Sequence, residues 1–299
     1  MGSALTWGLG SFLFARTLGR HAESEPPTAA ATNLFKNSLA AAIFVVAFAF
    51  RSEEHWPAAT AWPWLLASGV CGFAIGDALY LAALPRSGVQ IATMVALVHV
   101  PATALLDWLF LGRTLSLATL AWMLVVVSGV WLVVGEHRRG EARTSPGVRT
   151  GAVLALCAAI SQSFGVVLGH EGMHGATLLG GTLVRMVGGI AGALAAAGIV
   201  GLARTSLRQE CGTLTRPLRG TDHFRPLATA ALFGSVLGLP LFHFALRGLP
   251  SGVASVLFAT TPLFTLPLGF LFGERHGPRA WLGTAIGFGG VLGLVASLA

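Results

Sequence analysis

The chain reads ALLDWLFLGRTLSLATLAWMLVVVSGVWLV from Ala104 to Val133 and TLPLGFLFGERHGPRAWLGTAIGFGGVLGL from Thr265 to Leu294. A proline stands three residues before each stretch, and identical residues recur at an offset of 161 positions. The pairs are Arg86 with Arg247, Pro101 with Pro262, Leu105 with Leu266, Gly112 with Gly273, Gly129 with Gly290, and Val130 with Val291. Such self-similarity predicts that the chain is a duplication of one structural unit.

Composition indicates that this unit lies in a lipid bilayer. Of the 299 residues, 54% are hydrophobic and only 10% are charged, which is too few charges to cover a surface that faces water. Apolar stretches of about twenty residues recur along the chain, and a stretch of that length crosses a hydrocarbon core as a helix. We therefore expect lipid as a partner. The loop arginines indicate contact with headgroups, and we expect no nucleic-acid partner.

The apolar pattern predicts an all-α membrane protein of ten transmembrane helices. The predicted spans are residues 3–19, 30–50, 62–84, 88–110, 116–135, 149–169, 177–202, 226–246, 252–272 and 279–298. Five spans precede Pro146 and five follow it, so we expect one five-helix repeat over residues 1–140 and a second over residues 146–299. Because five is odd, the second repeat enters the membrane from the opposite face, and the two repeats are predicted to be inverted.

Inverted repeats have a functional consequence. They place equivalent helices around an axis in the membrane plane, with a polar cavity between them that opens alternately to either side. This architecture favours a secondary transporter that moves a small metabolite or drug-like solute by alternating access, and we expect coupling to protons. The pattern G-x-x-x-x-G-K-S does not occur, which argues against direct coupling to ATP. We expect no cofactor and no enzymatic activity. The sequence leaves open whether the chain forms a homodimer.

Both quoted stretches resemble the EamA repeat of the drug/metabolite transporter superfamily, in which a proline-bearing helix, a Leu-Gly-Glu turn and a helix ending in Gly-Val close each unit. Trp7-Gly8 and Gly76-Asp77 with Tyr80 are further features similar to that family. Arg113 stands where the turn usually has a glutamate, such as Glu274 in the second copy. The resemblance implies a multi-pass protein of the plasma membrane. It also implies a central cavity formed by four helices of each half, with the fifth and tenth helices as an outer scaffold.

Two cations lie inside predicted spans, where a charge costs several kcal/mol unless it faces water or a partner. Lys36, the only lysine, shares a helix face with Asn33 and Asn37 in the second span. Arg185 holds the comparable place in the seventh span, with Thr182 three residues before it. Both cations are predicted to attract a carboxylate or another anionic group of the substrate. In the alternative, each lies near a helix end and extends to the headgroups.

Asp77 is the only acidic residue well inside a predicted span, and Phe73 and Tyr80 share its helix face. A buried carboxylate can bind and release a proton during a transport cycle, so Asp77 is the predicted proton-coupling residue. In the alternative, Asp77 forms an ion pair with Lys36 or Arg185 and locks the helices together. The sequence pattern does not separate these two interpretations.

Further polar residues and two prolines complete the predicted site. Four side chains inside the spans are predicted to contact the substrate: Tyr80, His99, Gln162 and His243. A packing histidine with a hydrogen bond is the common alternative for His99 and His243. Pro101 and Pro262 remove backbone hydrogen bonds inside their helices, so both are predicted to be hinges for a rocking mechanism.

One motif points to a different class of protein. The segment His170-Glu171-Gly172-Met173-His174 matches H-E-x-x-H, which on a helix places two zinc ligands and a catalytic base on one face. This pattern would fit an intramembrane zinc metalloprotease. Gly169, Gly172 and Gly175 weaken a helix here, and no convincing third ligand follows, so we expect no metal site. A membrane scaffold or sensor without a transported substrate is the remaining alternative.

Overall fold

The computed structural model describes residues 2–19, 27–112, 116–140, 146–203, 221–248, 258, 261–271 and 277–298, and these ranges contain helices and turns but no β-strand. In chain order the elements are α1 (Gly2–Gly19), α2 (Ala29–Ala49), η1 (Ala59–Ala61), α3 (Trp62–Gly69), η2 (Val70–Gly76), α4 (Asp77–Ala96), α5 (His99–Leu111), α6 (Leu117–Gly140), α7 (Pro146–Met173), α8 (Leu178–Ala203), α10 (Thr221–Ala231), η4 (Leu232–Leu237), α11 (Gly238–Gly248), α13 (Thr261–Leu271) and α14 (Pro278–Leu298). Elements η2 and η4 are π-helices, and η1 is a 3-10 helix. The all-α prediction is confirmed for the described residues.

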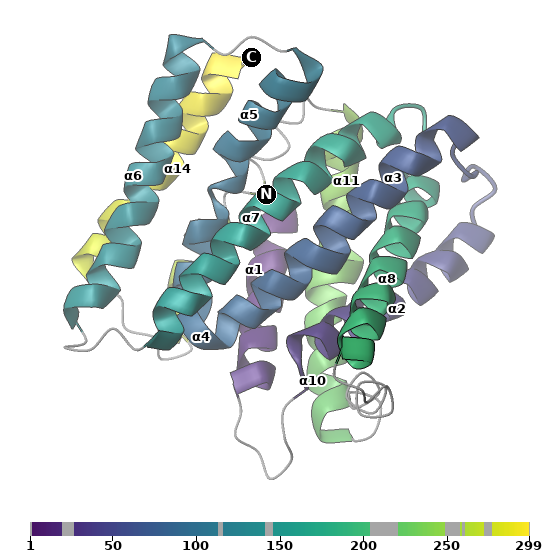
Figure 1. Cartoon of the computed structure of the whole chain (residues 1–299), viewed down its shortest axis with the longest axis horizontal. Helices are drawn as coiled ribbons and strands as arrows, with labels where there is room; N and C mark the ends of the chain where they lie inside the picture. Colours follow the sequence, from purple (N-terminus) through teal and green to yellow (C-terminus); the bar gives the residue numbers. More distant parts are fainter. Residues whose placement is uncertain are drawn as a thin grey trace.

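Helix length and composition agree with a membrane protein. Five helical segments of the described chain are long and apolar enough to cross a bilayer: Ala29–Ala49, Ala59–Ala96, Gly147–Met173, Leu178–Ile199 and Phe224–Phe244. Two shorter apolar helices cover His99–Leu111 and Leu117–Gly129. The helices pack side by side in one bundle, with the connections near its two ends (Figure 1).

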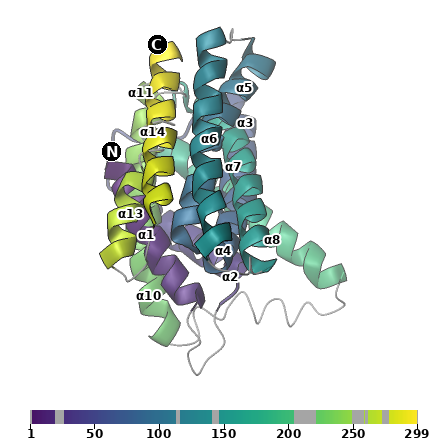
Figure 2. The same cartoon turned by 90° about the vertical axis from the view of Figure 1, so that its left-hand side faces the viewer.

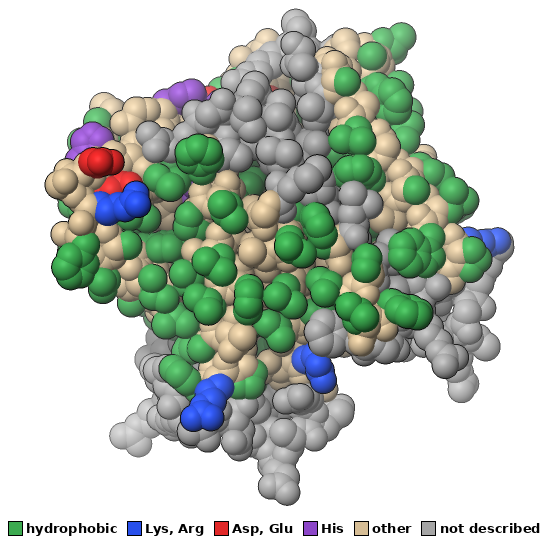
Figure 3. Space-filling view, turned by 180° about the vertical axis from the view of Figure 1, so that it is seen from behind, with side chains coloured by type: hydrophobic (Ala, Val, Ile, Leu, Met, Phe, Trp, Pro, Cys, Tyr) green, Lys and Arg blue, Asp and Glu red, His purple; other side chains and the backbone are tan. Residues whose placement is uncertain are grey.

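The polarity of the surface is the reverse of that of a soluble protein. Large apolar side chains such as Val46, Leu109 and Phe244 are more than 50% exposed, whereas Lys36 and Asp77 are buried. Hydrophobic side chains cover the middle of one face, and the visible charged side chains lie near its edges (Figure 3). An apolar exterior around buried polar groups is the arrangement that lipid favours as the solvent.

Each half of the chain contains one π-helical segment at the same place in the repeat. η2 covers Val70–Gly76 and η4 covers Leu232–Leu237. Moving η2 by the repeat offset of 161 residues would place it over residues 231–237, almost on top of η4. π-Helical turns are rare and frequently lie at functional sites. This shared irregularity agrees with a duplicated unit.

The predicted span over residues 88–110 is interrupted. The helix is sharply kinked at Gly88, whose φ of 76° and ψ of 161° are not helical, and it is broken again at Leu97, between α4 and α5. Pro101 lies in the first turn of α5 and explains the second break, because a proline ring clashes with the carbonyl four residues before it. Pro262 follows Thr261, where the described part of α13 begins, and the two residues before them lie outside the described ranges.

Helices α6 and α14 lie side by side at one edge of the bundle (Figures 1 and 2). Glycines permit this close approach: a Cβ on Gly129 would collide with the backbone of Gly287, and one on Gly290 would lie 2.7 Å from the Val126 nitrogen. Small residues at an interface are typical of helix pairs in membranes. The two helices cover the fifth and tenth predicted spans, which the family resemblance places in an outer scaffold.

Several helices extend beyond their predicted spans, among them α6, α7 and α10, which begins at Thr221, before the predicted span over residues 226–246. α6 continues to Gly140 although the apolar span ends at residue 135, and α7 runs from Pro146 to Met173 around a predicted span of residues 149–169. Charged residues such as glutamate and arginine are good helix formers, so a helix can continue past the apolar stretch that lies in lipid. Apolar length therefore measures the membrane-embedded part of a helix and not the whole helix.

Candidate functional site

A cavity lies between the two halves of the chain, and its atom-free space, together with the open solvent at its mouth, is about 740 Å³. Residues 1–140 contribute Trp7, Phe73, Asp77, Tyr80, Ala96 and His99 to its wall. Residues 146–299 contribute, among others, Ala158, Ala159, Gln162, Arg185, Phe242 and Phe258. An apolar wall with a few polar side chains is typical of a site for a small molecule.

An ion pair of the first half forms one part of this wall. Lys36 Nζ lies 2.5 Å from Asp77 Oδ2, and both side chains are buried. Lys36 also donates to Asn37 Oδ1 at 2.9 Å, and Gln162 Nε2 donates to the second carboxylate oxygen, Asp77 Oδ1, at 2.7 Å. Asp77 and Gln162 face the cavity, and Lys36 lies behind Asp77. Every charge of the pair thus has the additional hydrogen bonds that a buried ion pair requires.

The position of Asp77 depends on the π-helical segment that immediately precedes it. Side chains from both halves of the chain bind the carbonyls of η2. Asn33 Nδ2 in α2 donates to the Phe73 carbonyl at 2.7 Å, and Ser161 Oγ in α7 donates to the Cys71 carbonyl at 2.7 Å. Because buried carbonyls need partners, these side chains stabilise the irregular turn and with it the orientation of Asp77.

Arg185 of the second half is bound to a neutral histidine. Arg185 Nη1 donates to His243 Nε2 at 2.5 Å, and His243 Nδ1 lies 2.6 Å from Thr182 Oγ1. The Thr182 hydroxyl donates its own proton to the Leu178 carbonyl at 2.7 Å, so it accepts from Nδ1. This chain of hydrogen bonds requires an imidazole with its single proton on Nδ1. Arg185 and His243 are both buried.

The guanidinium of Arg185 has binding capacity that the described residues leave unused. Its Nη2 makes a long hydrogen bond of 3.4 Å to the Gly165 carbonyl, and its Cζ lies 4.9 Å from the centroid of the Phe73 ring. Its Nε is buried and has no hydrogen-bond partner among the described residues. Arg185 is part of the cavity wall, so a positive charge without an ion-pair partner among the described residues borders the cavity.

Aromatic rings form much of the remaining wall. The ring centroid of Trp7 lies 5.8 Å from that of Tyr80 and 5.6 Å from that of Phe258, and Phe242 lies 5.2 Å from Phe258. The Tyr80 hydroxyl shares a hydrogen bond of 3.0 Å with Ser11 Oγ. Packed rings of this kind give a rigid apolar surface against which the apolar part of a solute can lie.

A comparison with protein families matches the chain to the EamA-like transporter family over residues 1–135 and 149–296. The chain belongs to this family. It is a multi-pass protein of the plasma membrane. The family resemblance noted in the sequence is therefore confirmed.

Relatives of this EamA-like transporter agree with the assignment. A segment of the uncharacterized inner membrane transporter YedA of Escherichia coli K12 is 42% identical over 32% of this chain and 30% of its own, and the YedA proteins of strains O6:H1 and O157:H7 match equally. The match spans less than a third of the length of these relatives. One solved crystal structure has a TM-score of 0.60 and 18% identity, and the likeness covers 99% of this chain and 97% of that one. At that identity the likeness shows the fold alone.

Most of the residues that the sequence singles out lie at this cavity. Five predicted site residues are in its wall: Asp77, Tyr80, His99, Gln162 and Arg185. Lys36 and His243 lie behind the wall, where they bind Asp77 and Arg185. Neither cation extends to the headgroups, because Lys36 is only 1% exposed and Arg185 only 2%. Asp77 forms an ion pair with Lys36, and its predicted role in proton coupling stays a prediction.

The sequence analysis missed most of the aromatic wall. Phe242 and Phe258 are two of 18 phenylalanines, and their spacing does not separate rings that face lipid from rings that face the cavity. The available signals were Phe73 and Tyr80, which share a helix face with Asp77, and Trp7-Gly8, which the family resemblance marked without assigning it a role.

The H-E-x-x-H motif lies at the end of α7, and none of its residues is part of the cavity wall. The helix continues across Gly169 and Gly172 to Met173 and ends before Gly175, whose φ is 72°. A Cβ on Gly169 would lie 2.8 Å from Ser68 Oγ, and one on Gly172 would lie 2.7 Å from Leu65 Cγ. These glycines permit the close approach of α3 and α7, which offsets their low helix propensity.

Proposed function

We propose that this chain is a secondary transporter that moves a small organic anion or zwitterion by alternating access and does not change it chemically. The proposal rests on one observation. The cavity between the two halves contains Arg185, a buried cation whose hydrogen-bonding partner is neutral. A site between repeats is the arrangement that alternating-access transporters use.

The mechanism requires that residues 1–140 and 146–299 act as two inverted repeats of five transmembrane helices. The matching positions of η2 and η4 support this organisation. The cations support it too: Lys36 lies seven residues after Ala29, the first residue of α2, and Arg185 lies seven residues after Leu178, the first residue of α8. The family also matches the chain in two successive segments. Equivalent helices around a common axis allow one half to open while the other closes.

Charge favours a substrate that carries a carboxylate or a similar anionic group. Asp77 neutralises Lys36, so the positive charge available to a solute is that of Arg185. A carboxylate beside the guanidinium would give its Nε an acceptor, and guanidinium and carboxylate form strong paired hydrogen bonds. Further contacts to the solute are expected from Tyr80, His99 and Gln162. The rings of Trp7 and Phe242 would contact its apolar part.

Proton coupling is assigned to Asp77. A proton on this carboxylate would remove the attraction to Lys36 and weaken the hydrogen bond from Gln162 Nε2, so the contacts between α2, α4 and α7 would loosen together. Loss of the proton would restore the ion pair. Pro101, beside the break between α4 and α5, and its counterpart Pro262 are the bending points of this movement.

The test begins with a comparison of the metabolites of cells with and without the protein. Solutes whose distribution changes are then assayed in proteoliposomes, with and without an imposed pH gradient. We expect the gradient to drive transport by the wild type but not by Asp77→Asn, and we expect Arg185→Gln to abolish transport. Transport that is indifferent to the gradient would contradict the coupling, and the absence of any transported solute would contradict the function itself.

Access of water to the cavity distinguishes a transporter from a scaffold. In a background without Cys71, Cys157 and Cys211, the variant Ala159→Cys places a thiol in the cavity wall. The matched control Ala155→Cys places one a single turn earlier in α7, in the hydrophobic core. We expect a water-soluble thiol reagent to modify only Ala159→Cys, and the transported solute to protect it. If the reagent modifies neither thiol, the result supports a membrane scaffold and contradicts a transport cavity.

A further inference from the structure

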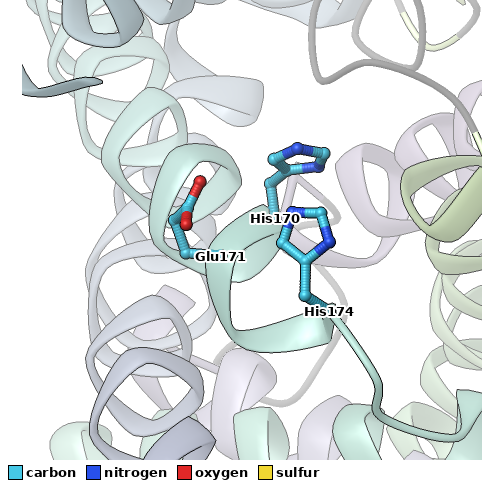
Figure 4. Close-up of side chains that lie close together, drawn as sticks. All are labelled: His170, Glu171 and His174. Carbon is cyan, nitrogen blue, oxygen red and sulfur yellow. The ribbon is translucent and has the colours of Figure 1, made fainter. Parts of the chain in front are cut away.

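The last turn of α7 and the residue after it bring together three side chains that can bind a metal ion (Figure 4). His170, Glu171 and His174 each offer one ligand atom, and these atoms lie within 4.8 Å of one another. The two imidazole rings are edge to face, with centroids 4.6 Å apart. His170 is buried, Glu171 is half-buried and His174 is exposed, so the cluster opens to the protein surface.

The types of ligand favour a d-block dication such as Zn²⁺. Two imidazole nitrogens and a carboxylate oxygen are ligands that zinc binds well, and a carboxylate offsets part of the charge of the ion. Zinc–nitrogen bonds are about 2.0–2.1 Å long, so the ligand atoms of a tetrahedral zinc ion lie about 3.3 Å apart. A zinc ion would have to draw the ligand atoms, which now lie within 4.8 Å of one another, to about that separation, and water would complete the coordination.

Packing holds the backbone beneath this cluster in place. Met173 is buried in a small core with Leu65 and Val184. Gly175, with a φ of 72°, makes the turn that ends the helix, and Thr177 Oγ1 then donates to the His55 carbonyl at 2.7 Å. A backbone fixed on both sides lowers the entropy cost of bringing two imidazoles to one ion.

We propose that His170, Glu171 and His174 form a surface site that binds Zn²⁺. The site lies where α7 leads into α8, and these helices carry Gln162 and Arg185 of the cavity. A bound ion would fix the last turn of α7 and the residue that follows it. The proposal is independent of the transport function, because no residue of the cluster lines the cavity.

The experiment uses the full chain in detergent, purified through a tag without histidines and stripped of metal with EDTA. Calorimetric titration with Zn²⁺ is expected to show about one ion per chain, and Co²⁺ is expected to give the visible absorption of a tetrahedral site. The double variant His170→Ala/His174→Ala should lose both signals. His55→Ala in the neighbouring loop is the matched control and should retain both.

A second variant changes one exposed residue only, so that a loss of zinc binding can be distinguished from a loss of the fold. His174→Ala should leave the thermal midpoint in EDTA unchanged, weaken Zn²⁺ binding roughly tenfold or more, and remove the rise in midpoint that Zn²⁺ gives the wild type. Glu171→Gln should weaken binding at the same stoichiometry. Three results would overturn the proposal: no saturable binding by the wild type, wild-type binding by the double variant, or an equal loss in His55→Ala.

Discussion

The two halves of this EamA-family protein bury a cation in different ways. In the first half, Lys36 is paired with the carboxylate of Asp77. In the second half, Arg185 lies seven residues after the start of α8, as Lys36 does after the start of α2, but it binds the neutral His243. The residue at the repeat offset from Asp77 is Gly238, which has no side chain to offer. Both halves therefore contain a buried cation, Lys36 or Arg185, but the carboxylate of Asp77 has no counterpart at position 238.

This difference has an energetic meaning. A buried ion pair approximately compensates its own desolvation, whereas a buried cation without a counter-charge costs several kcal/mol. Arg185 offsets part of that cost with one hydrogen bond to His243 and the face of the Phe73 ring. A transporter can keep such an incomplete site where an anionic solute completes it, so the asymmetry predicts different responses of the two halves to mutation.

The largest effect is expected when the first-half ion pair is broken on one side only. Asp77→Ala leaves Lys36 buried without a counter-charge and should lower the free energy of unfolding by about 3–5 kcal/mol. Adding Lys36→Met removes both charges and should restore most of the stability. Thermal unfolding of the detergent-solubilised proteins measures both changes. A double variant as unstable as Asp77→Ala would show that the stranded charge is not the cause.

The second-half cation should respond in the opposite sense. Arg185→Gln removes a charge without a counter-charge, so we expect little loss of stability but a weakening of solute binding by about 2–3 kcal/mol, roughly a hundredfold. Arg185→Lys keeps the positive charge but lacks the planar guanidinium with its paired donors. Its affinity for the solute should therefore lie between those of the wild type and Arg185→Gln. Concentration-dependent transport in proteoliposomes measures these affinities. Wild-type transport by Arg185→Gln would remove this residue from the binding site.

The contrast between the halves also separates what the sequence could predict from what it could not. An ionisable side chain in an apolar span is costly, and that argument alone led to Asp77, Arg185 and Lys36. It could not choose between the two cations as the partner of Asp77. That choice depends on η2, whose altered helical register orients Asp77 toward Lys36, and residue propensities do not mark a π-helix.

The end of α7 shows the same limit of local argument. Glycine propensity predicts a weak helix around His170, yet Gly169 and Gly172 are where α3 comes close enough to exclude a Cβ. Packing between helices therefore overrides the propensity. The helices long enough to cross a bilayer, such as Ala29–Ala49 and Leu178–Ile199, were easier to predict, because a bilayer imposes one length on every helix that crosses it, whereas the full set of ten spans stays a prediction.

A smaller effect is expected at the hydrogen bond between Arg185 and His243. His243→Phe removes the acceptor of Arg185 Nη1 and should lower the free energy of unfolding by about 1–3 kcal/mol. His243→Gln can still accept through its amide oxygen and should lose less. In an Arg185→Gln background the cost of His243→Phe should shrink, which a double-mutant cycle of thermal unfolding measures. Additive costs would mean that the two side chains are not coupled.

The smallest effect concerns how the two cation-bearing helices begin. The N-terminus of α2 is capped by a neutral group, Thr28 Oγ1, which accepts from the Ala31 N–H at 3.2 Å. The N-terminus of α8 is capped by a carboxylate from the other half: Glu54 Oε2 accepts from the Leu179 N–H at 3.0 Å and from the Gly180 N–H at 3.4 Å.

Both caps satisfy amides that the helix leaves without partners, but only the carboxylate also interacts with the helix dipole. Thr28→Ala should therefore cost about 1 kcal/mol at any ionic strength. Glu54→Gln keeps an acceptor and loses the charge, so it should cost about 0.3–1 kcal/mol in low salt and less in high salt. Thermal unfolding of both variants across a salt series measures the difference. An equal salt response would show that charge plays no part in starting α8, and the halves would then differ only inside the cavity.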